Sequence, residues 1–286
     1  MSSLPPAIRI VEVGPRDGLQ NIDQHIPTNA KIQFINILSD AKLSEIEVTS
    51  FVSPKWIPQL ADAQEVSDKI IRDPHIIYTA LVPNVYGLDM ALDADYSSVA
   101  VFTAASETFS LKNTNCSITD SIKRIEDMKS SFQESSLRVR AYISTVWACP
   151  YEGNIPAETV LPIINSLFEL GVEEISLGDT IGKATSEDVK KTLKIILSEY
   201  NANRFSLHFH DTYNHALENI KVGMEYGITS FDSSAGGIGG CPFAPGASGN
   251  ISTDSIIKLC QKLGIKTGIK EKKISEASKL IQTYLN

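Results

Sequence analysis

Short β-branched runs alternate along the chain with longer segments whose apolar residues recur every three or four positions. This alternation is typical of repeated strand–helix units. Eight such units in roughly 250 residues predict a (β/α)₈ barrel, a TIM barrel, rather than a doubly wound sheet. We expect the strands at Ile8–Val13, Glu45–Phe51, Ile76–Val82, Ser98–Ala104, Arg138–Thr145, Glu174–Leu177, Phe205–His210 and Ser230–Ser234.

Helical periodicity follows most of these strands. Gly171 and Gly227 predict left-handed helix ends, and Thr185 with Asp188 predicts a capping box. We expect a single barrel domain over residues 1–286, with a further helical segment at about 252–286 that covers one end of the barrel or contacts a partner subunit. Helices are expected over Asn29–Ala41, Ile118–Gln133, Ala157–Leu170, Ser186–Tyr200, Ala216–Tyr226 and Glu271–Tyr284, with a short one over Tyr86–Ala94.

The charge and the apolar pattern exclude several classes of partner. A net charge of −8 and a pI near 5.2 argue against nucleic acid or an anionic membrane, because both require a basic face. Met1–Ile10 lacks the apolar run of a secretory signal, and no apolar segment is long enough to span a bilayer. The four cysteines form no C-x-x-C pair, which is typical of reduced thiols, so we expect a cytoplasmic protein.

The unusual residue clusters fall at the carboxyl ends of predicted strands, where barrel enzymes build their active sites. They are Gly14–Gln20, the segment from Glu47, Gly178–Thr180 and the glycine-rich stretch that precedes Cys241. That stretch lacks the spacing of a dinucleotide site or a P-loop. We expect it to be a mobile loop that brings the accessible thiol of Cys241 to the site.

Two histidines and an aspartate predict a metal site. His208 and His210 lie two apart on a strand, so their side chains point to the same side. The alternative is a hydrogen-bonded pair of core histidines. Asp17 lies near them if the barrel closes, although an aspartate before Gly18 is also common in turns. With a side-chain carbonyl such as that of Asn250, this set suits Mg²⁺ or Mn²⁺.

Arg16 lies in the same cluster as Asp17. Its guanidinium could face an oxyanion and stabilise charge that develops during a reaction. The alternative is a salt bridge to Asp17 or Glu47. Both interpretations can hold, because a salt bridge can orient a catalytic group.

Three segments resemble the 3-hydroxy-3-methylglutaryl-CoA lyase family, and the resemblance runs from about residue 8 to the end. The segments are Val11–Asn21, Glu47–Gln59 and Ser234–Asn250. The first is shared with a wider superfamily of barrel metallolyases and Claisen-type synthases. The Gly-Gly-Cys-Pro sequence that contains Cys241 distinguishes the lyases.

The resemblance implies a homodimer that cleaves an acyl-CoA, 3-hydroxy-3-methylglutaryl-CoA, into acetyl-CoA and acetoacetate by metal-assisted retro-Claisen chemistry. By resemblance, Arg16 would neutralise the enolate and Cys241 would exchange a proton with its carbon. Asp17, His208 and Glu47 would also count as catalytic. The implied metal ligands are Asp17, His208, His210 and Asn250, and the residues that line or support the site are Arg16, Gln20, Glu47, Tyr142, Asp179 and Thr180.

Other activities remain open at this point. A related lyase could prefer a longer 3-substituted glutaryl-CoA. A 4-hydroxy-2-oxo acid aldolase is the nearer rival, but it would not need the loop that carries Cys241. Claisen-type synthases usually carry an additional carboxyl-terminal domain, for which 286 residues leave no room. A catalytically silent binding barrel would not need this set of ligand, cation and thiol residues.

Overall fold

Eight parallel strands close into a barrel, as predicted. The computed structural model describes residues 4–239 and 249–285. Around the barrel the strands follow the order β1-β10-β9-β8-β5-β4-β3-β2, so the first, seventh and eighth barrel strands are neighbours. The barrel strands are β1 Arg9–Glu12, β2 Glu45–Ser50, β3 Ile77–Leu81, β4 Ser98–Ala104, β5 Arg138–Ser144, β8 Glu174–Asp179, β9 Phe205–Phe209 and β10 Ser230–Ser233.

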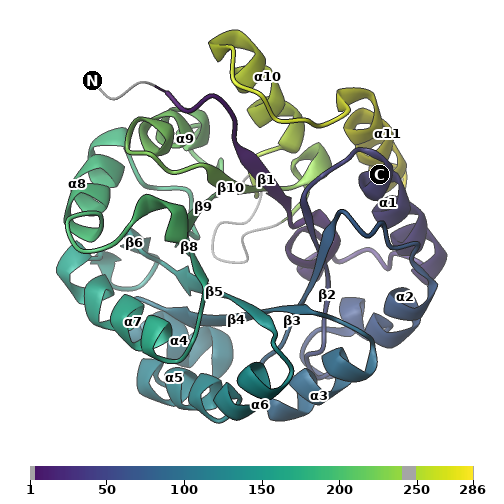
Figure 1. Cartoon of the computed structure of the whole chain (residues 1–286), viewed down its shortest axis with the longest axis horizontal. Coiled ribbons are helices and arrows are strands. Elements are labelled where there is room, and N and C mark those ends of the chain that lie inside the picture. Colours follow the sequence, from purple (N-terminus) through teal and green to yellow (C-terminus); the bar gives the residue numbers. More distant parts are fainter. Residues whose placement is uncertain (1–3, 240–248, 286) are drawn as a thin grey trace.

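Helices surround the barrel as an outer ring (Figure 1). The left-handed glycines Gly171 and Gly227 and the capping box of Thr185 with Asp188 are present as predicted. The helices are α1 Thr28–Asp40, α2 Ala63–Lys69, α3 Val85–Asp93, α4 Glu107–Thr114, α5 Ile118–Glu126, α6 Lys129–Glu134, α7 Ala157–Glu169, α8 Ser186–Ile196, α9 Ala216–Glu225, α10 Thr253–Leu263 and α11 Glu271–Gln282.

Several predicted bounds were wrong. The single helix over 118–133 is two helices, because the N–H of Met128 turns to the carbonyl of Ile125 and ends the first one. α8 ends at Ile196 rather than Tyr200, and β8 continues to Asp179 rather than ending at Leu177. α2, α4 and the small hairpin of β6 Ala148–Cys149 and β7 Gly153–Asn154 were not predicted.

The apolar core lies between the strands and the helices, not inside the barrel. It contains Phe34, Phe205 and Phe231, all fully or almost fully buried. Inside the barrel, Leu81, Ala100 and Tyr142 form a small apolar cluster of buried residues. The remaining interior is largely polar, so it needs a complete set of ionic and hydrogen-bonding partners.

Four alternating charges close the amino-terminal end of the barrel, and we call them the lower ring. Each is the first residue of its strand: Arg9, Glu45, Arg138 and Glu174. Arg9 and Arg138 each lie 2.9 Å from a different carboxylate oxygen of Glu45. Arg9 also pairs with Glu174, and Arg138 lies 3.6 Å from it, so the ring is closed.

The carboxyl-terminal helix α11 lies beside α1 (Figure 1). It buries Ile274, Ala277 and Ile281, and it also contacts the short 3₁₀ turn Ala235–Gly237 that follows β10. This packing beside α1 and the 3₁₀ turn accounts for the apolar face of α11. Among the helices that the structure describes, none is long and apolar enough to cross a membrane.

Candidate metal and active site

A π-helical turn, Gly14–Gly18, presents Arg16 and Asp17 at the carboxyl end of β1. The carbonyl of Val13 accepts the N–H groups of Arg16, Asp17 and Gly18, at 3.2, 2.8 and 3.1 Å. At Gly14 a Cβ atom would lie 2.6 Å from the carboxylate of Glu12, so the tight turn requires glycine. These hydrogen bonds fix the backbone from which the side chains of Arg16 and Asp17 extend.

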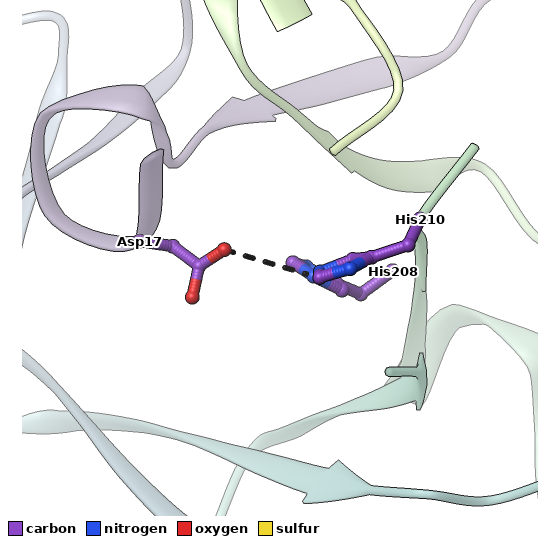
Figure 2. A group of neighbouring side chains, drawn as sticks. All are labelled: Asp17, His208 and His210. Atoms are coloured by element: carbon purple, nitrogen blue, oxygen red, sulfur yellow. Dashed lines mark ion pairs between the residues drawn. The ribbon is translucent and has the colours of Figure 1, made fainter. Parts of the chain in front are cut away.

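Asp17, His208 and His210 converge as predicted, with ligand atoms that lie within 4.8 Å of one another. Figure 2 shows both imidazoles facing Asp17, and their ring centroids lie 5.3 Å apart. His208 Nε2 lies 3.9 Å from Asp17 Oδ2. His210 Nδ1 is buried and has no hydrogen-bond partner among the described residues, so the alternative of a hydrogen-bonded core pair does not account for it.

Asn250 reaches the same group through a bridge between its backbone and that of His210. Its Nδ2 donates to Asp17 Oδ2 at 2.8 Å and to the carbonyl of Ile238 at 3.3 Å. A half-turn of the amide would place Oδ1 where Nδ2 now lies. A carboxylate, two imidazoles and a carboxamide oxygen then form a hard, mixed donor set that fits Mg²⁺ or Mn²⁺.

The electrostatics of Asp17 and His210, although not those of His208, favour the protonation states that a metal requires. Burial acts to lower the pKa of His208, but the hydrogen bond to Asp232 and the charge of Asp17 outweigh it and raise the pKa. Burial acts to raise the pKa of Asp17, but the charges of Arg16 and the two histidines outweigh it and lower the pKa to about 2. Burial, together with His208, lowers the pKa of His210 to about 4. At neutral pH Asp17 is therefore anionic and His210 neutral, as metal ligands must be.

Arg16 contacts four of the other predicted site residues. Its Nε pairs with Glu47, and its Nη1 lies 2.8 Å from Asp17 Oδ1 and 3.3 Å from Gln20 Oε1. The Tyr142 ring centroid lies 5.3 Å from the guanidinium carbon, and the Tyr142 hydroxyl donates to Glu47 at 2.6 Å. Both predicted salt bridges are present, and they hold the guanidinium at the edge of the Asp17 group.

Asp179 and Thr180 shape the neighbouring loops. The Asp179 carboxylate accepts the N–H groups of Lys183 and Ala184 at 3.1 and 2.9 Å, and burial raises its pKa to about 6. Thr180 Oγ1 accepts the N–H of Thr145 at 2.8 Å, which links the loops after β5 and β8. These contacts are those of supporting residues. Cys241 lies outside the described residues.

Four interior residues behind the histidines were missed by the sequence analysis: Arg140, Ser176, Ser206 and Asp232. Asp232 Oδ2 lies 3.3 Å from His208 Nδ1, and the other three surround the same carboxylate. A signal was available, because charged residues recur at every second position in strands that are otherwise apolar, as at Arg138 and Arg140.

Known proteins resemble this chain over nearly its full length. The HMGL-like family model matches residues 7–281. Hydroxymethylglutaryl-CoA lyase YngG of Bacillus subtilis is 47% identical over 278 residues, which is 97% of this chain and 93% of that protein.

Solved structures agree with the sequence match. The HMG-CoA lyase of Bacillus subtilis has a TM-score of 0.97 at 46% identity and covers 99% of this chain and 95% of its own. An HMG-CoA lyase of Acinetobacter baumannii, in complex with coenzyme A and 3-methylmalate, has a TM-score of 0.94 at 36% identity. That match covers 100% of this chain and 93% of the Acinetobacter chain. The match of the family model over residues 7–281, together with the Asp17, His208 and His210 group, shows that the chain belongs to the HMGL-like family.

Proposed function

We propose that this protein is a hydroxymethylglutaryl-CoA lyase that cleaves 3-hydroxy-3-methylglutaryl-CoA into acetyl-CoA and acetoacetate. The observation that carries the proposal is the 2.8 Å contact between Arg16 and Asp17, which places a buried guanidinium directly beside the candidate metal ligands. Retro-Claisen cleavage needs both elements, a cation for the enolate and a group that activates the hydroxyl. The names and identities of the relatives support the same activity.

Asp17, His208, His210 and Asn250 would hold the divalent ion, Mg²⁺ or Mn²⁺. Such an ion supplies a Lewis acid that makes the tertiary hydroxyl of the substrate easier to deprotonate. The side chains prepare the site for it: Asp17 is anionic, His210 is neutral, and His210 Nδ1 is buried without a partner in the described part of the chain.

The bond changes balance without any further reactant. A base removes the proton of the C3 hydroxyl. The electron pair of the O–H bond then forms the C=O bond of the acetoacetate ketone, and the C2–C3 bond breaks. The electron pair of that bond passes to the thioester as the enolate of acetyl-CoA, and C2 then gains a proton. Arg16 stabilises the enolate oxygen, while Glu47 and Tyr142 hold the guanidinium. We assign the proton for C2 to the thiol of Cys241.

A panel of substrates tests this activity. Purified protein with Mg²⁺ is expected to release acetoacetate and acetyl-CoA in equal amounts from 3-hydroxy-3-methylglutaryl-CoA. Turnover of a longer 3-substituted glutaryl-CoA or a 4-hydroxy-2-oxo acid should be slower. Cys241→Ala should lose most of the turnover while it retains Mn²⁺ binding. Faster cleavage of the oxo acid, with no effect of Cys241→Ala, would contradict the proposal.

We also propose that the protein acts as a cytoplasmic homodimer, with α11 as the candidate interface. Because Ile274, Ala277 and Ile281 are buried within the chain, a second copy would have to contact the opposite, charged face of α11. Sedimentation of the wild type beside Lys272→Glu, a change on that face, checks this. A monomer at micromolar concentration would contradict the dimer.

A further inference from the structure

Asp232 lies between the candidate metal site and the charged interior of the barrel, and its two oxygens have different partners. Oδ2 lies 3.3 Å from His208 Nδ1 and accepts the hydroxyl of Ser176 at 2.7 Å. Oδ1 accepts the hydroxyl of Ser206 at 3.0 Å and pairs with Arg140 Nη2. The side chains of Asp232 and Arg140 are fully buried. Oδ2 of Asp232 therefore contacts the imidazole of His208, and the contacts of Oδ1 fix the position of the carboxylate.

Arg140 connects Asp232 to both ends of the barrel interior. Its Nε lies 2.8 Å from Glu174 of the lower ring, and its Nη1 donates to the Tyr142 hydroxyl at 2.7 Å. That hydroxyl in turn donates to Glu47, the partner of Arg16. A continuous set of ionic and hydrogen-bonding contacts thus joins the lower ring to the two sides of the site.

We propose that Asp232 is a positioning residue for the divalent ion: it keeps His208 protonated on Nδ1, so that Nε2 presents its lone pair toward Asp17. The reason is the chemistry of the pair. A carboxylate only accepts hydrogen bonds, so it selects the imidazole tautomer that donates from Nδ1. Such outer contacts also orient the ring and raise the basicity of the nitrogen that binds the metal. The inference rests on the divalent site of the proposed function.

A merely structural role for Asp232 would be to neutralise Arg140, and the geometry separates this role from positioning. Arg140 already pairs with Glu174. It pairs with Oδ1 of Asp232, whereas His208 lies next to Oδ2. Ser176 and Ser206 each support one of these oxygens, so they provide a matched pair of substitutions.

The direct test is Asp232→Asn, with Mn²⁺ binding measured by electron paramagnetic resonance in the absence of substrate. Losing an outer partner of a metal-binding histidine is expected to weaken binding roughly 10–100-fold. In the metal-free wild type, ¹⁵N NMR should show His208 protonated on Nδ1, and Asp232→Asn should lower the population of that tautomer, because an amide can also donate to Nδ1. The chain has only 5 histidines, which makes the assignment practical.

The serine pair serves as the control and decides the question if Asp232→Asn does not fold. Ser176→Ala removes the support of the oxygen next to His208 and should weaken Mn²⁺ binding about fivefold, the effect of one hydrogen bond. Ser206→Ala should stay within about twofold, because it acts on the other oxygen. Equal effects of the two alanines, with Asp232→Asn unfolded, would overturn the proposal.

If Asp232→Asn folds, a variant that binds Mn²⁺ as tightly as the wild type and keeps the same His208 tautomer would overturn the proposed role of Asp232. Failure of the lyase proposal gives a different result. A wild type that binds Mn²⁺ but cleaves no 3-hydroxy-3-methylglutaryl-CoA contradicts the activity alone. A wild type that binds no Mn²⁺ overturns the metal site and the role of Asp232 together.

Discussion

The two ends of the barrel interior use the same residue types to opposite effect. At the lower ring each carboxylate has at least two arginine partners, and the charges alternate around a closed circle. At the upper end Arg16 lies between Glu47 and Asp17, and His210 Nδ1 has no partner among the described residues. Satisfied buried charges hold a structure together, whereas incompletely satisfied ones mark the place where a ligand binds.

The largest effect should come from a change at the upper end. Arg16→Gln removes the charge that faces the developing enolate, and kcat is expected to fall roughly 100–1000-fold. Mn²⁺ binding should persist, because the ligands remain. Steady-state assays of Arg16→Gln beside Arg138→Gln check this, since the second change removes a guanidinium from the lower ring. Equal losses of kcat would abolish the distinction between the two ends.

Arg138→Gln should act on stability instead. It leaves the buried Glu45 with one arginine rather than two. Breaking a buried ion pair costs roughly 3–5 kcal/mol, and partial exposure of Arg138 reduces this to about 2–3 kcal/mol in the free energy of unfolding. Urea denaturation measures the change. Activity of the folded variant within about threefold of wild type is expected, and a larger loss would show that the ring also serves catalysis.

A smaller effect is expected from Glu12, which supports the upper end from outside the barrel. It accepts the N–H groups of Gly14 and Ala235, and burial raises its pKa from 4.5 to about 7. The folded state therefore binds more protons than the unfolded state within this window, so stability from this group falls as pH rises from about 4.5 to 7.

The second oxygen of Glu12 accepts the hydroxyl of Thr253 at 2.7 Å. Glu12→Gln should remove the pH dependence, because its amide can still accept both N–H groups and can donate to the Thr253 oxygen. Relative to wild type, the variant should gain on the order of 1–2 kcal/mol of stability between pH 5 and 7. Urea titrations at the two pH values measure this difference. Parallel pH profiles for the two proteins would contradict the raised pKa.

The sequence predicted the barrel because its strands are short, β-branched and regularly spaced. It also predicted which side chains meet, since Asp17 follows β1 and the histidines lie at the end of β9, and these two strands flank β10 once the barrel closes. α4 was missed because its apolar residues, such as Phe109 and Leu111, do not recur on one face. Ser106 is a preferred N-cap residue that the sequence offered, and in the structure its side chain accepts the N–H of Phe109.

The polar interior could not be derived with the same ease. Arg140, Glu174 and Asp232 come from three strands, and their pairing depends on register, which local periodicity does not determine. The π-helical turn at Arg16 was also beyond reach, because no propensity distinguishes it from a tight loop. The position of Cys241 stays a prediction.

The most direct test of the central claim is the rate of acetoacetate formation from 3-hydroxy-3-methylglutaryl-CoA by the wild type, measured before and after metal removal with EDTA and again after Mg²⁺ or Mn²⁺ is restored. We predict turnover that disappears with the chelator and returns with the ion. Turnover that persists without metal, or folded and metal-loaded protein that releases no acetoacetate, would contradict the account.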